Sequence, residues 1–92
     1  MKKQKIVRRS TADEIAQYVE METNGEIVQQ AKKISSKTVM GVKHECWDVR
    51  TDKSQFWVIT PPTNLYDQGE FKTLDETLTY HIGLAIRVME RL

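Results

Sequence analysis

The sequence predicts an α+β fold: a small single domain with the element order α-β-β-β-α, whose antiparallel three-stranded sheet carries both helices packed on one face. Two observations lead to this expectation. A helix-capping pattern stands before apolar residues at helical spacing near each end of the chain. The residues between are rich in β-branched and aromatic side chains. The 92 residues, of which 39% are hydrophobic, can bury one core but not two.

The first helix is predicted to begin beside Thr11. Thr11 and Glu14 have the spacing of a capping box, in which each side chain accepts a hydrogen bond from a backbone N–H of the first turn. The pair Asn24-Gly25 has the turn chemistry that ends a helix. The face that we expect to meet the core carries Ala12, Ile15, Tyr18 and Val19.

The middle of the chain predicts the three strands. Residues 26–34 are polar and alternate poorly, which favours an edge strand guarded by charged side chains. Residues 35–37 have the composition of a turn. Residues 39–51 and 55–60 are rich in β-branched and aromatic side chains, with turn residues between them, and predict a hairpin.

A proline pair is expected to end the last strand, because proline cannot donate a hydrogen bond to a sheet. The segment 61–72 that follows carries Leu65, Tyr66 and Phe71, which would be costly to leave in water. We expect this segment to fold back onto the core, with a short helical turn capped by Thr63-Asn64.

The last element is a second helix, because Thr73 and Glu76 repeat the capping-box spacing. No glycine or asparagine stop signal follows before the final residue. This is what we expect of the N-terminal domain of a longer protein. The apolar stripe of the helix consists of Leu74, Leu78, Ile82, Ala85, Met89 and Leu92.

The charges divide the chain into two parts. Five of the 14 basic residues come before Ser10, and all 13 acidic residues come after it. We therefore expect a basic arm over residues 1–9 and a single, mildly acidic domain over residues 10–92. A short basic arm contacts phosphate in some proteins and is only a solvated terminus in others.

The composition argues against several classes of protein. A single cysteine excludes a disulfide framework and a thiolate zinc site, so we expect a reducing, cytoplasmic location. The longest apolar runs are four residues, far short of the roughly 20 of a membrane-spanning helix, so no membrane partner is expected. The four glycines stand singly and form no phosphate-binding motif, so no cofactor is assigned.

One cluster of residues is of a type found in catalytic sites. His44, Cys46 and Asp48 alternate along one strand, which places their side chains on one face of the sheet. Either the thiol and imidazole work together, or the three side chains form an ordinary polar surface, and we favour the surface. With His81 they match no zinc-site spacing. We assign no catalytic and no metal residue, and expect His81 to be a structural histidine held by backbone or a tyrosine.

Whether the chain is an enzyme stays undecided, with the balance against catalysis. The run from Phe56 to Ile59 is apolar on both faces of its strand, so either both faces are covered or one aromatic side chain is displayed. We expect a non-catalytic module for protein interaction or self-association, with a protein partner or a second copy of the chain. Its contact residues would be Phe56, Trp57, Ile82, Ala85, Met89 and Leu92.

The alternative function is nucleic-acid binding. It would combine an exposed strand aromatic, on which bases stack, with the cations of the arm, which contact phosphate. The cations are Lys2, Lys3, Lys5, Arg8 and Arg9.

Overall fold

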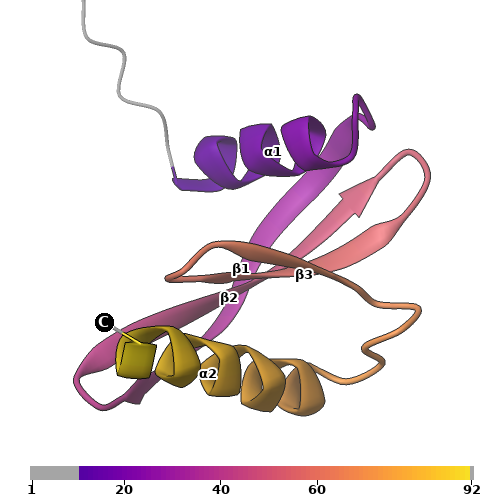
Figure 1. The fold of residues 1–92 in the computed structure, drawn as a ribbon. Helices are drawn as coiled ribbons and strands as arrows, with labels where there is room; N and C mark the ends of the chain where they lie inside the picture. The colour runs from indigo at the N-terminus through magenta and orange to yellow at the C-terminus, as the bar shows by residue number, and fades with distance from the viewer. Residues whose placement is uncertain (1–10, 92) are drawn as a thin grey trace, which may run out of the picture.

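The structure is a computed structural model that describes the backbone of residues 11–91 and the side chains of residues 11–87. Its strands form one antiparallel sheet in the order β1-β2-β3-β4 (Figure 1). The α+β class is confirmed, but the sheet has four strands and the expectation of three is wrong. The elements are α1 (Thr11–Glu22), β1 (Val28–Val39), β2 (Val42–Thr51), β3 (Gln55–Thr60), β4 (Asn64–Asp67) and α2 (Leu74–Arg91).

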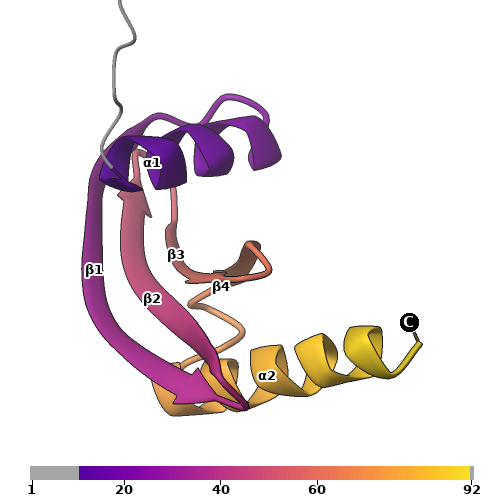
Figure 2. The ribbon, with the colours of Figure 1, turned by 90° about the vertical axis from the view of Figure 1, so that its left-hand side faces the viewer.

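The two helices cover opposite faces of the sheet. On β2, Trp47 and Val49 join the cluster beneath α1, whereas Cys46 joins the cluster beneath α2. Successive residues of a strand point to opposite faces, so the prediction that both helices pack on one face is wrong. The physical reason lies in β3, which is apolar on both sides and needs a cover on each. The helices also lie toward opposite ends of the strands (Figures 1 and 2).

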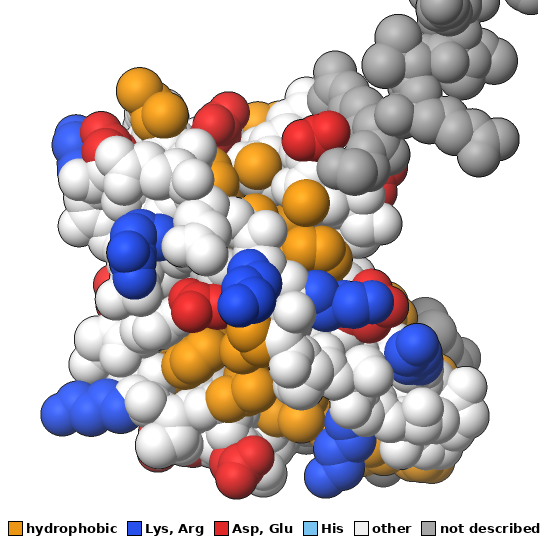
Figure 3. Space-filling view, turned by 180° about the vertical axis from the view of Figure 1, so that it is seen from behind, with side chains coloured by type: hydrophobic (Ala, Val, Ile, Leu, Met, Phe, Trp, Pro, Cys, Tyr) orange, Lys and Arg blue, Asp and Glu red, His pale blue; other side chains and the backbone are white. Residues whose placement is uncertain are grey.

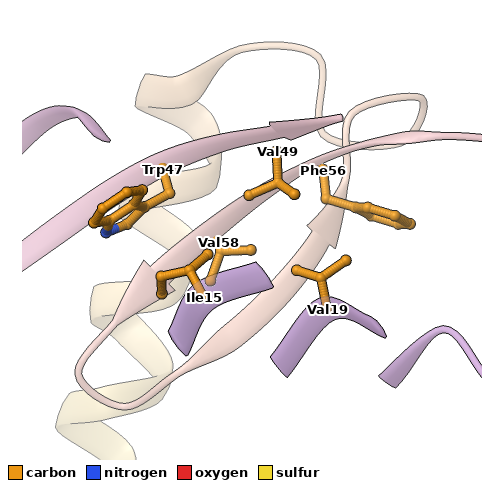
Figure 4. Close-up of a cluster of buried hydrophobic side chains, with 6 residues drawn as sticks. All are labelled: Ile15, Val19, Trp47, Val49, Phe56 and Val58. Atoms are coloured by element: carbon orange, nitrogen blue, oxygen red, sulfur yellow. The ribbon is translucent and has the colours of Figure 1, made fainter. Parts of the chain in front are cut away.

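The cluster beneath α1 is a compact apolar core. Val19, Val49 and Val58 have no exposed surface, and the side chains of α1 point onto the strands (Figure 4). Each fully buried side chain of this kind contributes about 1.5–3 kcal/mol to stability. The predicted inner face of α1 is confirmed. The buried members of this cluster are Ile15, Val19, Trp47, Val49, Phe56 and Val58.

The end of α1 and the start of α2 follow the predicted chemistry. At the end of α1, the backbone N–H of Gly25 donates to the carbonyl oxygen of Glu20 at 2.9 Å, and Gly25 has a φ of 103°. This left-handed conformation suits glycine. At the start of α2, the backbone N–H of Glu76 donates to Oγ1 of Thr73 at 3.2 Å.

The hairpin of β1 and β2 differs from the prediction. Residues 35–37 continue β1 and pair with residues 44–46 of β2, after a register shift between Lys33 and Ser35. The chain reverses instead at Met40-Gly41, whose φ values of 52° and 80° suit a two-residue hairpin turn. The ladder with β2 thus overrides the local turn preference of the serines. The exposed lysines of the predicted edge strand do lie on the sheet edge.

The segment after the proline pair folds onto the core, as expected, but not as a helical turn. Asn64–Asp67 forms β4, which pairs Leu65 with Val58 of β3. This pairing buries Tyr66 and half-buries Leu65, and the gain from burial outweighs the capping preference at Asn64. The predicted reversal follows at Asp67, whose Oδ1 accepts a hydrogen bond from the backbone N–H of Gly69 at 2.6 Å.

The inner face of α2 is confirmed as far as its side chains are described. Leu78 is buried, and Leu74 and Ile82 pack partly buried against the same cluster. The predicted stripe residues Met89 and Leu92 lie outside the side chains that the structure describes. Within residues 11–91, no helix has both the length and the apolar composition that a membrane crossing requires.

Candidate functional site

A mostly apolar cavity of about 280 Å³ lies between α2, the tip of the β1–β2 hairpin and the prolines after β3. Its size is near the lower end of small-ligand sites, and it is partly open to solvent. Among its wall residues, His44 is the one whose side chain carries nitrogen or oxygen. The wall is formed by Val39, Met40, Val42, His44, Pro61, Pro62, Ile82, Ala85 and Ile86.

The cavity exists because the β1–β2 hairpin is longer than the rest of the sheet. β3 ends at Thr60, which pairs with Glu45, so the residues of β2 before Glu45 pair with β1 alone. This overhang reaches α2 (Figure 2). Val42 and Val39 pair across the hairpin and face the same side as Cys46, the side that α2 covers. Helix residues at positions i, i+3 and i+4 complete the wall, namely Ile82, Ala85 and Ile86.

His81 ties α2 to the other walls of the cavity. Its Nε2 lies 3.1 Å from the carbonyl oxygen of Pro61, and its Nδ1 lies 2.7 Å from the hydroxyl of Tyr66. A carbonyl only accepts, so Nε2 carries the proton and Nδ1 accepts from Tyr66. Burial lowers the pKa of His81; the hydrogen bond to Pro61 opposes this and nearby His44 adds to it. His81 is therefore a structural histidine held by backbone and a tyrosine, as predicted.

His44 is buried without a hydrogen bond at one ring nitrogen. Only 4% of the residue is exposed, and its Nδ1 has no partner among the described residues. The ring packs edge-on against that of His81, with centroids 5.5 Å apart. An unsatisfied buried polar group costs about 1–3 kcal/mol. The unpaired Nδ1 is itself buried within the fold, so it is a local cost to stability and offers no hydrogen bond to an occupant of the cavity.

The other members of the predicted polar cluster do not join His44 in a reactive arrangement. Cys46 lies on the same face, as predicted, but it is fully buried beneath α2. Burial raises the pKa of its thiol, and the hydrogen bond with Ser35 only partly opposes this. Asp48 accepts a hydrogen bond from Nε2 of Gln68 at 2.8 Å. A nucleophilic cysteine needs a lowered pKa and access to substrate, and Cys46 has neither.

The expectation of a polar sheet surface is wrong for His44 and Cys46, because α2 covers that face. In the part of the chain that the structure describes, no group of three or more His, Cys, Asp or Glu residues is placed to hold a metal ion. Both ring nitrogens of His81 are already occupied by protein groups. What the cavity offers is therefore mainly apolar contact.

The predicted interaction residues on β3 turn inward. Phe56 is 6% exposed and belongs to the core beneath α1. Trp57 is half-buried in the cluster beneath α2, where its Nε1 donates to the carbonyl oxygen of Phe71 at 2.8 Å. A partner would reach Phe56 only if α1 moved away. Of the two readings of this strand, coverage on both faces is the one that the structure shows.

The predicted interaction residues on α2 divide differently. Ile82 and Ala85 are half-buried and line the cavity, whereas the side chains of Met89 and Leu92 lie outside the described part. The basic arm over residues 1–9 also lies outside it. Sequence reasoning missed the cavity walls from the hairpin tip and the prolines, because they come from distant segments with no shared pattern.

The face of the molecule opposite to that of Figure 1 carries no unbroken apolar surface in its described part. Figure 3 shows apolar side chains in separate groups, with basic and acidic side chains between them. Scattered apolar side chains of this kind are ordinary protein surface. No family model, curated protein or solved structure matches the chain. The case for a function therefore rests on the geometry of the cavity.

Proposed function

We propose that the chain is a non-catalytic interaction module that binds a segment of a partner protein in the cavity beside α2. The observation that carries this proposal is an apolar cavity of about 280 Å³, lined by half-buried residues of a helix face. Pockets that receive one anchoring side chain supply most of the energy of many protein interfaces. Ile82 and Ala85, which the apolar stripe singled out, form part of this wall.

The chemistry of the site supports binding over catalysis. The thiol of Cys46 is buried and has a raised pKa, and the ring nitrogens of His81 hold Tyr66 and Pro61. Cys46 is also free of any disulfide. This agrees with our proposal that the module works in the reducing cytoplasm.

Nucleic-acid binding is the weaker candidate. It needs an aromatic side chain displayed by the sheet as well as the basic arm. Phe56 is buried, and the half-buried indole of Trp57 is hydrogen-bonded to Phe71. Neither side chain is displayed by the sheet in the way that base stacking needs. The arm, with Lys2, Lys3, Lys5, Arg8 and Arg9, would then have to act without stacking.

Selection from a displayed library of random peptides tests the proposal without knowledge of the partner. The bait is the whole chain, with Ala85→Asp as the test variant and Thr79→Asp as the matched control on an exposed position of the same helix. A carboxylate in the cavity wall would be desolvated by any apolar ligand, which is costly. We expect selected peptides to bind the wild type and the Thr79→Asp variant but not the Ala85→Asp variant.

Circular dichroism must first show that both variants keep the wild-type fold. Failure to select any peptide, or equal binding to both variants, would contradict the proposal. Sedimentation equilibrium of the chain alone distinguishes a separate partner protein from self-association. A mass of 10.7 kDa fits a separate partner, whereas a larger mass that the Ala85→Asp variant lacks would make the partner a second copy.

A further inference from the structure

We propose that the outer edge of β1 receives an acidic, extended segment of a partner protein, which pairs with β1 as an additional strand of the sheet. This surface is separate from the cavity, so the proposal goes beyond the proposed function and does not depend on it. Three observations support it: the position of β1 in the sheet, the lysines along the strand and the charges that those lysines meet.

The outer side of β1 offers a long row of backbone groups. β1 is the first strand in the sheet order, and no strand within residues 11–91 pairs with its outer side. It runs for 12 residues, about twice the usual length of a strand. Figure 2 shows the middle of β1 at the outside of the molecule, away from both helices. Alternate residues of such an edge direct their N–H and C=O groups outward, where an extended chain pairs with them.

The lysines of β1 determine which kind of strand can pair there. Residues 10–92 carry nine basic and 13 acidic side chains, yet β1 carries three lysines and no acidic residue. Lys32, Lys33 and Lys37 are all exposed. Lysines on an edge oppose pairing with another strand of the same charge, and β1 of a second copy is such a strand. A strand that carries carboxylates is attracted instead.

Two of these lysines are available for a carboxylate from a partner. Nζ of Lys33 lies 3.5 Å from Oε2 of Glu45, so this charge is already partly balanced. Lys32 and Lys37 form no ion pair with any residue that the structure describes. Each cation that meets a carboxylate across a strand pair adds a small stabilisation, and each that meets a lysine subtracts a similar amount.

The register of β1 with β2 places these two lysines on one face of the sheet. Lys32 pairs with Asp48 and Lys37 pairs with His44, and alternate residues of a strand such as β2 share a face. Residues of an added strand that stand opposite the two lysines share that face as well. The partner segment that fits best therefore carries acidic side chains at alternating positions.

Peptide titrations followed by NMR of the isotope-labelled whole chain test the proposal. The acidic peptide alternates glutamate with threonine, and the basic peptide has lysine in place of each glutamate. The third peptide is the acidic one with its peptide nitrogens methylated, which removes the N–H donors and keeps the charge. At low salt we expect the acidic peptide to bind about tenfold more tightly than either of the others. It should also slow hydrogen exchange of amides in β1.

A pair of charge-reversal variants locates the effect. The double variant Lys32→Glu with Lys37→Glu should prefer the basic peptide to the acidic one. The double variant Lys53→Glu with Lys72→Glu makes the same change of net charge at exposed positions outside β1, and it should keep the preference of the wild type. The same preference in both variants would show that the charges of β1 do not select the peptide.

The wild-type titrations alone can overturn the proposal, even if a variant fails to fold. Equal affinity for the acidic and basic peptides, or binding of neither at β1, contradicts it. Equal affinity for the methylated peptide would show contact between charges without strand pairing, which also contradicts it. Shifts confined to the cavity would overturn this proposal and leave the proposed function standing. A dimer of the chain alone that protects the amides of β1 would make the occupant a second copy and contradict an acidic partner.

Discussion

The two faces of the sheet are covered by helices of similar amphipathic character, yet their interiors differ. Beneath α1 the buried cluster is mainly apolar and packs around Val19, Val49 and Val58, which have no exposed surface. Its polar groups are the indole N–H of Trp47, buried without a partner among the described residues, and the buried Thr51. Beneath α2 the interior mixes apolar residues with buried polar ones, and the helix stands beside a cavity of about 280 Å³. The buried polar residues on this side are His44, Thr77 and His81.

This difference separates the part of the molecule that stabilises the fold from the part where we propose that a partner binds. A mainly apolar, close-packed interior is the arrangement that stabilises a fold most directly. Buried polar groups must each find a hydrogen bond within the fold, so an interior that holds them has fewer ways to pack. We therefore regard the α1 face as the main source of stability and the α2 face as the place of the proposed binding of a partner.

The largest effect is expected on the α1 face. Phe56→Ala should lower the free energy of unfolding by about 3–5 kcal/mol, because it removes a buried aromatic ring and leaves a cavity. Urea denaturation followed by circular dichroism measures this. The control is Ile27→Ala, at a position 63% exposed, which should change stability by about 0.5 kcal/mol or less. Similar losses from both variants would show that Phe56 is not part of a packed core.

A smaller loss is expected where the α2 face holds its polar contacts. Tyr66→Phe removes the hydroxyl bound to His81 and leaves Nδ1 of that ring buried without a partner. We expect a loss of about 1–3 kcal/mol in the free energy of unfolding. Tyr80→Phe is the matched control, because Tyr80 is half exposed, and it should be nearly neutral. Equal stability of the Tyr66→Phe and Tyr80→Phe variants would contradict the hydrogen bond between Tyr66 and His81.

The α2 face should also make stability depend on pH through His81. Burial lowers its pKa in the folded state, so the folded chain binds fewer protons than the unfolded chain, where histidine titrates near about 6.5. The stability from neutral His81 is therefore complete above that pH and is lost as pH falls through the lowered value.

Urea denaturation of the wild type and of His81→Gln, at about pH 7.5 and about pH 5, isolates this contribution. The wild type should lose more stability between the two conditions than the variant does. The groups that face the ring are Tyr66, the carbonyl of Pro61 and His44, and both proteins retain them. If the two proteins lose the same free energy of unfolding between these pH values, His81 is not the source of the pH dependence.

The smallest effects come from two glycines of the α2 side, and they should have opposite signs. Gly83 lies within α2, and an added Cβ would meet nothing within 4 Å, so Gly83→Ala should stabilise by about 0.5–1 kcal/mol. Gly41 has a φ of 80° at the hairpin turn, where alanine is strained by roughly 1–2 kcal/mol. Thermal unfolding of both variants measures the difference, and a shared sign would contradict the turn.

The helices were predictable because their signals are local. Thr73 caps the first turn of α2. Thr11 and Glu14 have the capping-box spacing, and the apolar stripes lie at helical spacing. The coverage of both sheet faces also had a signal, namely the unbroken apolar run from Phe56 to Ile59, but this run fits a displayed aromatic equally well. Whether the strand is covered on both faces or displays an aromatic side chain depends on its contacts with the two helices. The residues of the strand alone do not reveal those contacts.

The errors arose where pairing with a distant strand outweighed local chemistry. Ser35 and Ser36 resemble a turn and Asn64 resembles a helix cap, yet each lies in a strand whose partner is fixed by burial elsewhere. The cavity was predictable only through Ile82 and Ala85 on the helix stripe. The burial of His44 beside the cavity was not predictable, because no spacing in the chain reveals that α2 covers this end of β2.

The most direct test of the difference between the faces is a methyl NMR titration of the whole chain with toluene. Shifts should appear at the cavity and be absent beneath α1, where Ile15, Val19 and Val49 report on the packed core. The methyl groups expected to shift are those of Val39, Val42, Ile82, Ala85 and Ile86. Shifts on both faces, or on neither, would contradict the assignment of binding to the α2 side.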